Sequence, residues 1–421
     1  MILEFSVTNY KSFKDKTTFS MVADSSDKTQ EQNCFEIGKT TLLKSAVIYG
    51  ANASGKSNFM EAFGTMKNVI TNSATYSSVN ENSINTQYFP FEFDESSLSE
   101  PTVLELYFLI DGIKYHYSFS YNENEIIDEF LYYYPNTKQS LLFKRKNDDY
   151  EFGTKLKGEK NLVKNVTDKP QLFLSNGANN KMVQLMLVDD YFKNSFRPVP
   201  FLDKNRDTNI TNSIAKFLYK KSNFIDYSSF MNLLTNLDTG ITKIEIEKVK
   251  TLKANYKIFT YHQYKHKDGT LTEQKFQLER ESIGTQKLFV IISLLLNTLK
   301  ETDCAIMIDE FERSLHPQIS KFLLSLFNNK DINKNGAQLI ISTHDTELLS
   351  KENNLRRDQV WFVEKDEFGV SDLFSLTDVE GVRKDVPFDK WYLSNRFGGV
   401  PNLKTFNFKI NFEHEPQTEI E

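Results

Sequence analysis

The chain has 421 residues, enough to bury a sizeable core and to form two or three domains. Hydrophobic residues make up 39% of it, and its 35 Phe and 19 Tyr argue against a disordered chain. The net charge of −6 argues against a protein that coats nucleic acid through a broad basic surface, but it leaves a local basic groove open.

The first 70 residues read as the start of an α/β fold. Residues 2–8 and 17–22 alternate apolar and polar side chains, which predicts strands on either side of a turn at residues 9–12. Residues 45–49 form a short apolar run that enters a glycine-bounded loop, and residues 57–70 have helical spacing. A strand, a loop and a helix in this order are typical of α/β proteins.

In the middle and at the end of the chain, the residue patterns predict a β-rich part, then a helical part, and then a second segment of α/β structure. Alternation predicts an antiparallel meander with strands at 89–93, 102–110, 113–121, 129–134 and 141–145. Helices are expected at 183–192, 213–222 and 230–237, followed by strands at 241–249, 256–264 and 275–279. The last predicted elements are a helix at 285–300, a strand at 304–309, a helix opened by Pro317 and a strand at 338–342.

Membrane and export signals are not expected. No apolar run reaches the roughly 18 residues of a membrane span, and the N-terminal residues lack the basic-then-apolar order of a signal peptide. We therefore expect a cytoplasmic protein that does not enter a membrane. Cys34 and Cys304 lie too far apart in the sequence to organise a disulfide framework, and they are too few for a thiolate metal site.

The most specific motif follows the predicted strand at 45–49 and matches the pattern GxxxxGK[ST]. It comprises Gly50, Ala51, Asn52, Ala53, Ser54, Gly55, Lys56 and Ser57. Its glycines let backbone N–H groups turn inward toward phosphate, and the helix that follows adds partial positive charge. Lys56 would reach the β- and γ-phosphates of a nucleotide, and the Ser57 hydroxyl would bind Mg²⁺. The motif predicts ATP and Mg²⁺ as ligands.

A second motif ends in two carboxylates. Residues 305–308 form an apolar strand that is followed by Asp309 and Glu310. Ligands bind at the carboxyl ends of strands in open α/β sheets, so we expect Asp309 to hold Mg²⁺ and Glu310 to orient or deprotonate the attacking water. An apolar strand that ends in acids is common, and it is the pairing with the phosphate loop that favours this interpretation.

A second anion cradle precedes the carboxylate strand. Ser282, Gly284 and Thr285 stand at the start of an apolar helix, where a hydroxyl, a glycine N–H and the helix dipole favour an anion. A chain with one phosphate loop has no phosphate of its own for this cradle. The arrangement makes sense if the cradle closes over the γ-phosphate held by another copy.

The order of motifs resembles the ABC-type ATPases, in the branch that includes SMC, RecF and OLD-like proteins. The segment 282–285 is similar to a degenerate form of their Ser-Gly-Gly-Gln signature, with Ile283 in place of the first Gly. The resemblance implies a D-loop at Ser314, Leu315 and His316, and a switch histidine at His344 that senses the γ-phosphate. It also implies that Lys11 and Ser12, in a segment similar to the N-F-R-S-F start of that branch, lie near nucleotide.

More narrowly, segments across the chain resemble the RloA-type ATPases of bacterial phage-defence and abortive-infection loci. These segments are residues 1–13, Pro90 to Asp94, Leu172 to Ser175, and Arg396 to Pro401. The resemblance implies an α/β fold: an ABC-type ATPase head built from both chain ends, with a β-rich arm and a helical insertion in place of a coiled coil. The expected parts are an N-terminal lobe at 1–87, the arm at 88–165, the insertion at 166–236, a C-terminal lobe at 237–412 and an acidic tail at 413–421.

Several candidate residues keep a plainer alternative. His344 alone would be read as a strand-end histidine bonded to backbone, and its position after the carboxylate strand favours the switch role. Gln87 is a candidate ligand for the Mg²⁺ shell, and a surface glutamine fits equally well. His262 and His266 suggest zinc only weakly, because they lie on a predicted strand without a third ligand. Basic residues between Lys138 and Lys164 fit a solvated face better than a nucleic-acid patch.

Three functions compete for this ATPase. The favoured one is Mg²⁺-dependent ATP hydrolysis at sites shared between two copies, in a sensor or scaffold that controls an effector in anti-phage defence. The resemblance implies a neighbouring TOPRIM-type nuclease as effector and a phage protein or DNA as trigger. The alternative is a RecF- or SMC-like DNA-repair ATPase that acts directly on DNA. A transporter's nucleotide-binding subunit fits least well, since about 200 residues separate the halves of the core.

Overall fold

The structure is a computed structural model, and it describes most of the chain. The described residues are 1–77, 83–199, 211, 214–216, 218–219, 227–237, 239–249, 256–382 and 386–401. The predicted acidic tail at 413–421 lies outside them, and so do five of the ten residues of the helix predicted at 213–222, whose described residues 214–216 and 218–219 are helical.

The core is a six-stranded sheet assembled from distant parts of the chain. Its order is β11 (Phe196–Val199), β15 (Ala305–Ile308), β16 (Gln338–Ser342), β5 (Ser45–Gly50), β17 (Val360–Lys365) and β18 (Ser371–Ser375). The first five strands are parallel and β18 is antiparallel to β17. Strands β5, β15 and β16 are buried along their whole length, which explains their continuous apolar runs.

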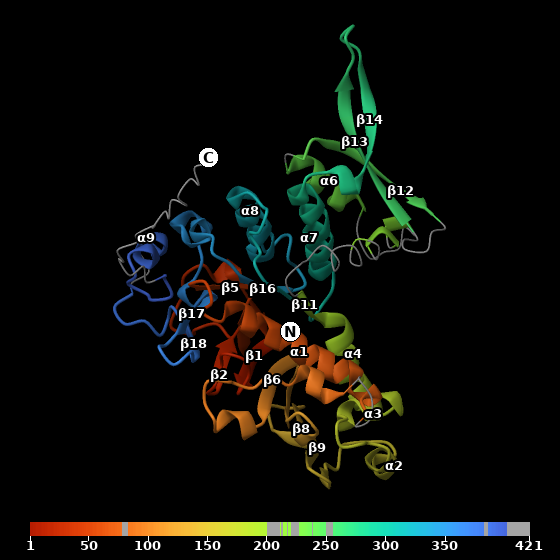
Figure 1. The fold of residues 1–421 in the computed structure, drawn as a ribbon, viewed down its shortest axis with the longest axis vertical. Coiled ribbons are helices and arrows are strands. Elements are labelled where there is room, and N and C mark those ends of the chain that lie inside the picture. Colours follow the sequence, from red (N-terminus) through yellow and green to blue (C-terminus); the bar gives the residue numbers. More distant parts are fainter. Residues whose placement is uncertain are drawn as a thin grey trace, which may run out of the picture.

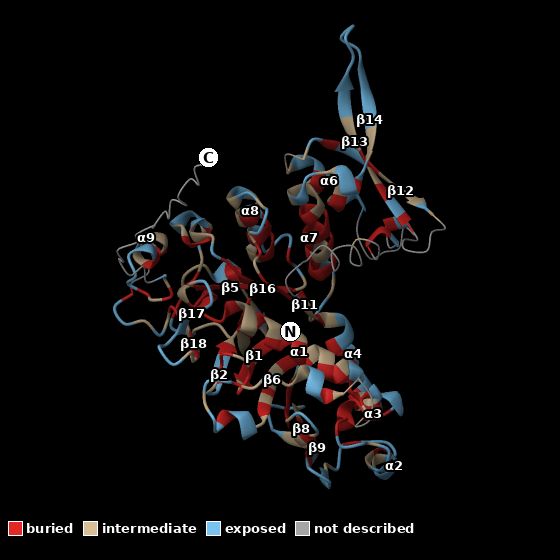
Figure 2. Ribbon diagram, viewed as in Figure 1, coloured by how far each residue is buried: buried red, intermediate tan, exposed pale blue. Residues whose placement is uncertain are grey.

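Helices cover both faces of this sheet. Successive residues of β5 point to opposite sides: Ala46 and Ile48 join the cluster around α1 (Lys56–Asn72), and Val47 and Tyr49 join the cluster around α7 (Ile283–Lys300) and α8 (Pro317–Asn328). Figure 1 shows α7 and α8 on the side of the sheet away from α1, and Figure 2 shows that the buried residues concentrate on these elements.

A second sheet packs on the other side of α1. It has seven antiparallel strands in the order β10 (Asp149–Phe152), β9 (Ser140–Lys146), β8 (Ile126–Tyr134), β7 (Ile113–Tyr121), β6 (Thr102–Ile110), β1 (Ile2–Thr8) and β2 (Thr17–Ser20). The rings of Phe5 on β1 and Phe63 on α1 stack with their centroids 4.1 Å apart. Helix α1 therefore lies between two sheets. The meander and the α/β fold class are confirmed, whereas the strand predicted at 89–93 is wrong, because Phe91 joins a turn held by Asn9.

The helical part interrupts the β-rich region and also supplies a core strand. It contains α2 (Lys160–Asn165), α3 (Phe173–Asn179), α4 (Val183–Asp190) and α6 (Tyr227–Asn236). The buried carboxylate of Glu129 accepts the N–H groups of Phe173 and Leu174 at 2.7 and 3.0 Å, which fixes the start of α3 on β8. The predicted insertion at 166–236 also includes β11, and the parallel pairing of β11 with β15 makes that strand part of the core.

A small sheet stands away from the core. Strands β12 (Ile241–Lys248), β13 (Tyr256–Lys265) and β14 (Leu271–Gln277) form it, and the β13–β14 hairpin projects from the body with exposed residues at its tip (Figures 1 and 2). We expected these strands within the C-terminal lobe. The remaining elements of the described residues are β3 (Cys34–Ile37), β4 (Thr40–Leu43), α9 (Phe388–Leu393), a π-helical turn at Tyr191–Ser195, and 3₁₀ turns at Glu31–Asn33, Ser73–Thr75, Ile84–Gln87, Ser97–Ser99, Leu278–Arg280, Thr346–Leu349, Lys351–Asn353 and Arg357–Gln359.

Among the described residues, helix α7 meets the length and mean hydropathy of a membrane span, although polar residues interrupt its apolar sequence. Its 18 residues include the window of highest hydropathy, and 61% of that window is buried inside the protein. Leu288, Phe289 and Ile292 belong to the core cluster on the α7 face of the sheet. Its apolarity is thus accounted for by packing in the core. Cys34 and Cys304 are both free thiols.

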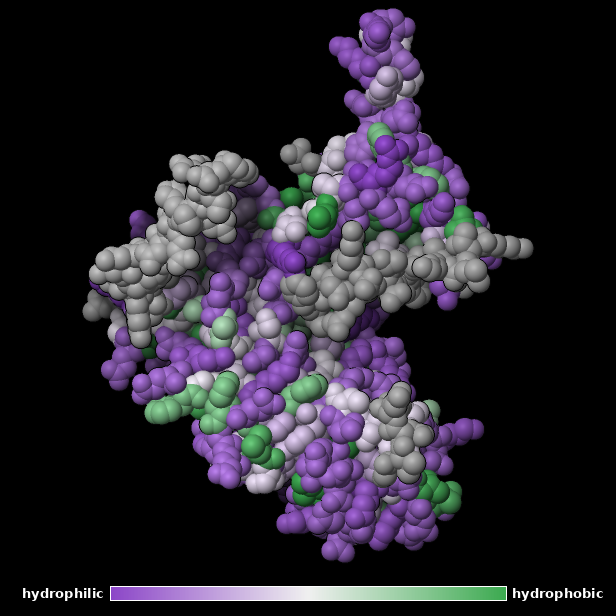
Figure 3. All heavy atoms as spheres, viewed as in Figure 1, coloured by the Kyte–Doolittle hydropathy of each residue, from purple (hydrophilic) through white to green (hydrophobic). Residues whose placement is uncertain are grey.

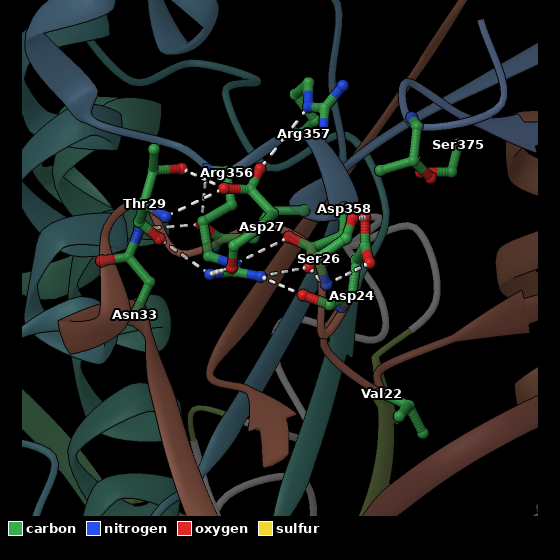
Figure 4. A network of polar contacts seen from close by, with 12 residues as sticks. Val22, Asp24, Ser26, Asp27, Thr29, Asn33, Arg356, Arg357, Asp358 and Ser375 are labelled. Carbon is green, nitrogen blue, oxygen red and sulfur yellow. Dashed lines mark hydrogen bonds and ion pairs between the residues drawn. The ribbon is translucent and has the colours of Figure 1, made fainter. Parts of the chain in front are cut away.

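A buried arginine ties the residues before β3 to the start of β17 (Figure 4). Arg356 is 2% exposed and forms a bidentate pair with Asp358, with distances of 2.9 and 2.7 Å. Its remaining N–H groups donate to the carbonyls of Asp24, Asp27 and Thr29. This guanidinium holds a loop of the N-terminal segment against the edge of the core sheet.

Replacing Arg356 by alanine should destabilise the protein strongly. The change leaves a buried carboxylate without its cation and the carbonyls of Asp27 and Thr29 without this donor, and removing one partner of a buried ion pair costs about 3–5 kcal/mol. The unfolding midpoint in urea should fall accordingly. Arg280→Ala is the matched control, because Arg280 is exposed and its guanidinium lies 5.0 Å from the Phe276 ring, a contact worth about 0.5–1 kcal/mol. Equal midpoints for the two variants would contradict this account.

Candidate functional site

The phosphate-binding motif forms a loop between the end of β5 and the start of α1. Gly55 precedes α1 with φ +117°, and a Cβ at this position would lie 2.8 Å from the Ser12 hydroxyl and against the hydroxyl of Ser371. Ser371 also donates to the carbonyl of Ser54 at 2.6 Å, and its N–H donates to the carbonyl of Ser12 at 2.7 Å. Only glycine fits here, between the turn after β1 and the start of β18.

Lys56 is buried inside this loop. Its Nζ donates to the carbonyls of Gly50 and Ala51 at 2.8 and 3.0 Å. Burial lowers the pKa of Lys56 to about 8, while the carboxylates of Asp309, Glu312 and Glu310 act in the opposite direction. Asn52 and Ala53 are exposed, and Ser54 and Gly55 are buried.

The two predicted carboxylates lie at the carboxyl end of β15, next to β16. Asp309 is 5% exposed, and its Oδ1 accepts the hydroxyl of Ser342 at the end of β16. The same hydroxyl accepts the N–H of Glu310 at 3.0 Å. Glu310 has φ 47°, and its partly exposed carboxylate lies 3.7 Å from Arg313. Asp309 thus has a fixed, buried position, and the neighbouring Glu310 is partly exposed at the same strand end.

His344 follows β16 and lies in the same electrostatic neighbourhood. Partial burial and the Lys56 ammonium lower the pKa of His344, and Glu312, Glu310 and Asp309 oppose the shift. Its N–H donates to Glu312 Oε1 at 2.8 Å. Glu312 therefore links the loop after β15 to the loop after β16. The structure brings Lys56, Asp309, Glu310 and His344 together at the ends of three neighbouring strands.

The second cradle forms the N-terminus of α7. The Ser282 hydroxyl caps the helix by accepting the N–H of Thr285 at 3.1 Å, and it also contacts the Thr285 hydroxyl at 2.9 Å. A Cβ on Gly284 would lie 2.8 Å from the carbonyl of Ser314, so the cradle rests on the predicted D-loop of its own chain. Ile283 is 75% exposed. The cradle thus faces solvent.

The predicted D-loop residues connect β15 to α8. Ser314 has φ 63°, and the N–H of Leu315 donates to the carbonyl of Glu312 at 2.8 Å. His316 caps α8 through its Nδ1, which accepts the N–H of Gln318 at 3.2 Å, and Pro317 occupies the first turn.

Of the three less specific candidates, Ser12 lies at the phosphate loop and Lys11 beside it. The Ser12 hydroxyl accepts the side-chain N–H of Asn58 on α1 at 2.8 Å, and Lys11 pairs with Glu61 on α1. Gln87 accepts the side-chain N–H of Asn68 at 2.9 Å, about three helical turns after Lys56. The structure therefore does not bring Gln87 to the loop, which counts against it as a Mg²⁺ ligand.

Sequence reasoning missed several contacts of the phosphate loop. Ser371 and Ser342 are ordinary strand residues in the sequence, and only the sheet order places them at the site. Tyr392 donates to the carbonyl of Gly399 at 3.0 Å, and a Cβ on Gly399 would lie 3.6 Å from the Gly50 Cα. The segment Arg396 to Pro401 is thus packed behind the start of the loop.

The oxygen ligands at the site suit Mg²⁺. Ser57 stands in the first turn of α1 and Asp309 at the end of β15, and this cation is held in proteins by one or two carboxylates together with substrate phosphates. Within the described residues, no group of three or more His, Cys, Asp or Glu side chains could hold a metal ion. His262 pairs with Glu281 at 2.8 Å, and His266 contacts Thr272 at 2.9 Å. The two histidines thus have separate partners.

Comparison with protein families identifies the family of this chain. Residues 45–350, well over half of the sequence, match the family described as AAA domain, putative AbiEii toxin, Type IV TA system. The chain belongs to this family. The family's AAA domain, together with the phosphate-binding loop between β5 and α1, marks the chain as a P-loop ATPase. A search of curated proteins finds no match.

Solved structures similar to this AAA domain include three SMC heads. An Smc head bound to the C-winged helix domain of ScpA is 13% identical, with 89% of this chain and 97% of that chain covered and a TM-score of 0.43. The SMC head domain from Thermotoga maritima is 14% identical, with 89% of this chain and 98% of that chain covered and a TM-score of 0.41. The third structure is the Smc head domain with an extended coiled coil bound to the C-terminal domain of ScpA, derived from Pyrococcus furiosus. It is 12% identical, with 94% of this chain and 98% of that chain covered and a TM-score of 0.42.

Proposed function

We propose that the protein hydrolyses ATP with Mg²⁺ at two composite sites of a two-fold dimer. The observation that carries the proposal is the solvent-facing cradle at the N-terminus of α7, where Ser282 caps the helix and Ile283 is 75% exposed. Such a helix end favours an anion. In an isologous dimer the cradle of each copy would close over the γ-phosphate held by the other copy.

Each residue then has a distinct task. Lys56 would leave the carbonyls of Gly50 and Ala51 to bind the β- and γ-phosphates, and the loop N–H groups would hold the same oxygens. Ser57 and Asp309 would hold Mg²⁺, which neutralises charge on the phosphates when it is bound. Glu310 would take the proton of the attacking water, and His344 would contact the γ-phosphate.

The shared site is tested by mixing two inactive variants. Ser282→Arg should bind ATP but not hydrolyse it, and Lys56→Ala should not bind ATP. In a mixed dimer one site carries both changes and the other carries neither, so part of the hydrolysis should return. Mixed dimers that form and remain inactive would overturn the shared site or the independence of the two sites.

A second variant distinguishes the loss of anion binding at the cradle from the loss of the helix cap. Ser282→Arg also removes an N-cap, which costs about 0.5–2 kcal/mol. Ile283→Glu keeps the cap and places a negative charge where the γ-phosphate of the other copy would arrive. It should reproduce the loss of hydrolysis and the recovery on mixing with Lys56→Ala.

The finer function we propose is an ATP-driven sensor or scaffold in anti-phage defence, acting in the cytoplasm. The family description, which names an AbiEii toxin and a type IV TA system, supports it, as does the RloA-like order of segments. An effector such as a TOPRIM-type nuclease would associate with one nucleotide state. Co-purification of the neighbouring gene's product with and without ATP tests whether the association depends on nucleotide. Equal association in both conditions would contradict the proposed sensor.

Direct action on DNA is the alternative outcome. Arg145, one of the basic residues between Lys138 and Lys164, is 2% exposed and donates to the carbonyl of Gln171 at 2.6 Å, so it serves the fold. Hydrolysis stimulated by duplex DNA, together with a salt-dependent affinity, would favour the DNA-repair function instead.

A further inference from the structure

The projecting hairpin ends in a strand whose outer edge has no partner strand among the described residues. β14 is the last strand in the order β12-β13-β14. Figure 1 shows the β13–β14 hairpin standing clear of the body, and Figure 3 shows that its surface, at the top of the view, is hydrophilic. We propose that β14 pairs antiparallel with β14 of a second copy across a two-fold axis, and that this contact forms without nucleotide.

β14 lacks the features that usually protect a sheet edge. Proline, bulges and short length keep edge strands from pairing with other chains. The outer strands of the two larger sheets have four or five residues each. β14 has seven residues with neither proline nor glycine, and it pairs with β13 without a register shift. β12, at the other edge of the small sheet, has a register shift after Ile241. Among the described strands, β14 is thus well suited to accept another strand.

Alternate residues of β14 present their backbone groups to this free edge. The N–H of His266 donates to the carbonyl of Thr270 at 2.8 Å, which makes these two residues a hydrogen-bonded pair. Hydrogen-bonded and non-hydrogen-bonded pairs alternate along an antiparallel ladder. Every second residue of β14 therefore turns its N–H and C=O away from β13. These residues are Leu271, Glu273, Lys275 and Gln277.

Charge selects one register for two copies of β14. A register centred on Glu273 places two carboxylates directly opposite each other, and a register centred on Lys275 does the same with two ammonium groups. Like charges in these positions are destabilising. A register centred on Gln274 instead places Glu273 of each copy opposite Lys275 of the other. All the outward-facing residues are then matched, and two pairs of opposite charge form.

Both charged side chains lie on one face of the small sheet. The Lys275 ammonium lies 2.6 Å from Glu247 and 3.1 Å from Glu245, and 4.0 Å from the centroid of the Phe259 ring. Glu273 accepts the hydroxyl of Thr242 at 2.9 Å. Glu273 is exposed and Lys275 is partly exposed, so each remains within reach of a strand added at the edge.

The β14 edge and the cradle of α7 are separate surfaces. His262 on β13 pairs with Glu281 at 2.8 Å, and Thr260 donates to the same carboxylate, so the base of the hairpin is fixed beside Ser282. The outer edge of β14 belongs to neither the cradle nor the phosphate loop. A copy can therefore keep its β14 contact while its cradle meets another copy, so ATP should join β14 dimers into larger species.

The test measures mass without nucleotide, where the proposed ATP-dependent contact does not form. In analytical ultracentrifugation the wild type should change from 49.0 kDa to twice that mass as its concentration rises. Glu273→Pro removes an outward N–H and keeps the ladder with β13, so it should raise the dimer Kd about tenfold or more. Gln263→Lys is the matched control, because Gln263 is exposed and lies opposite Glu273 on β13, away from the edge. It should dimerise like the wild type.

Two charge variants test the register. Glu273→Lys and Lys275→Glu should each raise the dimer Kd about tenfold or more, because like charges then face each other twice. Mixed in equal amounts, the two variants carry complementary charges and should form a heterodimer. A mixture that stays monomeric would overturn the register.

Two other results would overturn the β14 contact itself. One is a wild type that stays monomeric without nucleotide at every concentration. The other is a nucleotide-free dimer that Ile283→Glu dissociates and Glu273→Pro does not, because that result would assign the contact to the cradle. Loss of ATP binding would end the proposed function and leave these measurements unchanged.

Discussion

A Lys56→Ala protein is expected to remain folded and to lose detectable ATP binding. The change removes the ammonium that would face the β- and γ-phosphates, while the glycine-rich backbone of the loop is unchanged. In the folded chain Lys56 is 6% exposed and its ammonium is held by the loop carbonyls of Gly50 and Ala51, so no other element depends on it. Titration calorimetry with ATP and Mg²⁺ measures the effect.

Lys67 provides a matched control on the same helix. Burial lowers its pKa to about 8, as it does for Lys56, and its Nζ donates to the carbonyls of Phe196 and Lys193 at 2.8 and 3.0 Å. Lys67→Ala removes a partly buried lysine of α1 away from the phosphate loop. It should lower stability and keep ATP binding. An unchanged ATP affinity in folded Lys56→Ala would refute the phosphate site.

A Glu310→Gln protein is expected to bind ATP and to accumulate as a closed dimer. The amide keeps the size of the carboxylate but cannot take a proton from water, and losing a general base costs about 10²–10⁴ in rate. Asp309 and the loop would still hold the nucleotide. Light scattering should show a larger species with ATP and Mg²⁺ and none with ADP.

Glu312→Gln separates the neighbouring carboxylate from this role. Glu312 Oε1 accepts the N–H of His344 at 2.8 Å, and a glutamine keeps a carbonyl oxygen for that bond. Glu312→Gln should therefore retain most of the hydrolysis. Wild-type hydrolysis by Glu310→Gln combined with an inactive Glu312→Gln would transfer the water-activating role to Glu312.

Local patterns predicted the elements that carry the site. The strand at 338–342 appears as Gln338–Ser342, the helix at 57–70 as Lys56–Asn72, and the apolar run before Asp309 as β15. These patterns are reliable because a fully buried parallel strand needs continuous apolar residues and a glycine-rich loop has few other uses. The proximity of Lys56, Asp309 and His344 follows once the three strands are neighbours.

Contacts between segments that lie far apart in the sequence could not be predicted from local patterns of residues. β11 is a four-residue strand inside a helical region, and only its pairing with β15 identifies it. The aromatic pattern at 89–93 predicted a strand, yet Asn9 binds the N–H of Phe91 and makes the segment a turn. Gln87 had a plausible spacing, but α1 carries its partner Asn68 away from the loop. In each of these three segments, hydrogen bonds to a distant part of the chain determine the structure.

The two serines that flank Gly55 set a practical limit on how this protein can be divided. Ser12 and Ser371 both lie outside residues 45–350, and so do β1, β2, β17 and β18. A recombinant fragment cut at those family boundaries would contain the phosphate loop, both carboxylates and His344. It would also expose one edge of β5 and the aromatic side of α1 to water, so such a fragment should be insoluble. Biochemical work on this ATPase therefore needs both ends of the described chain.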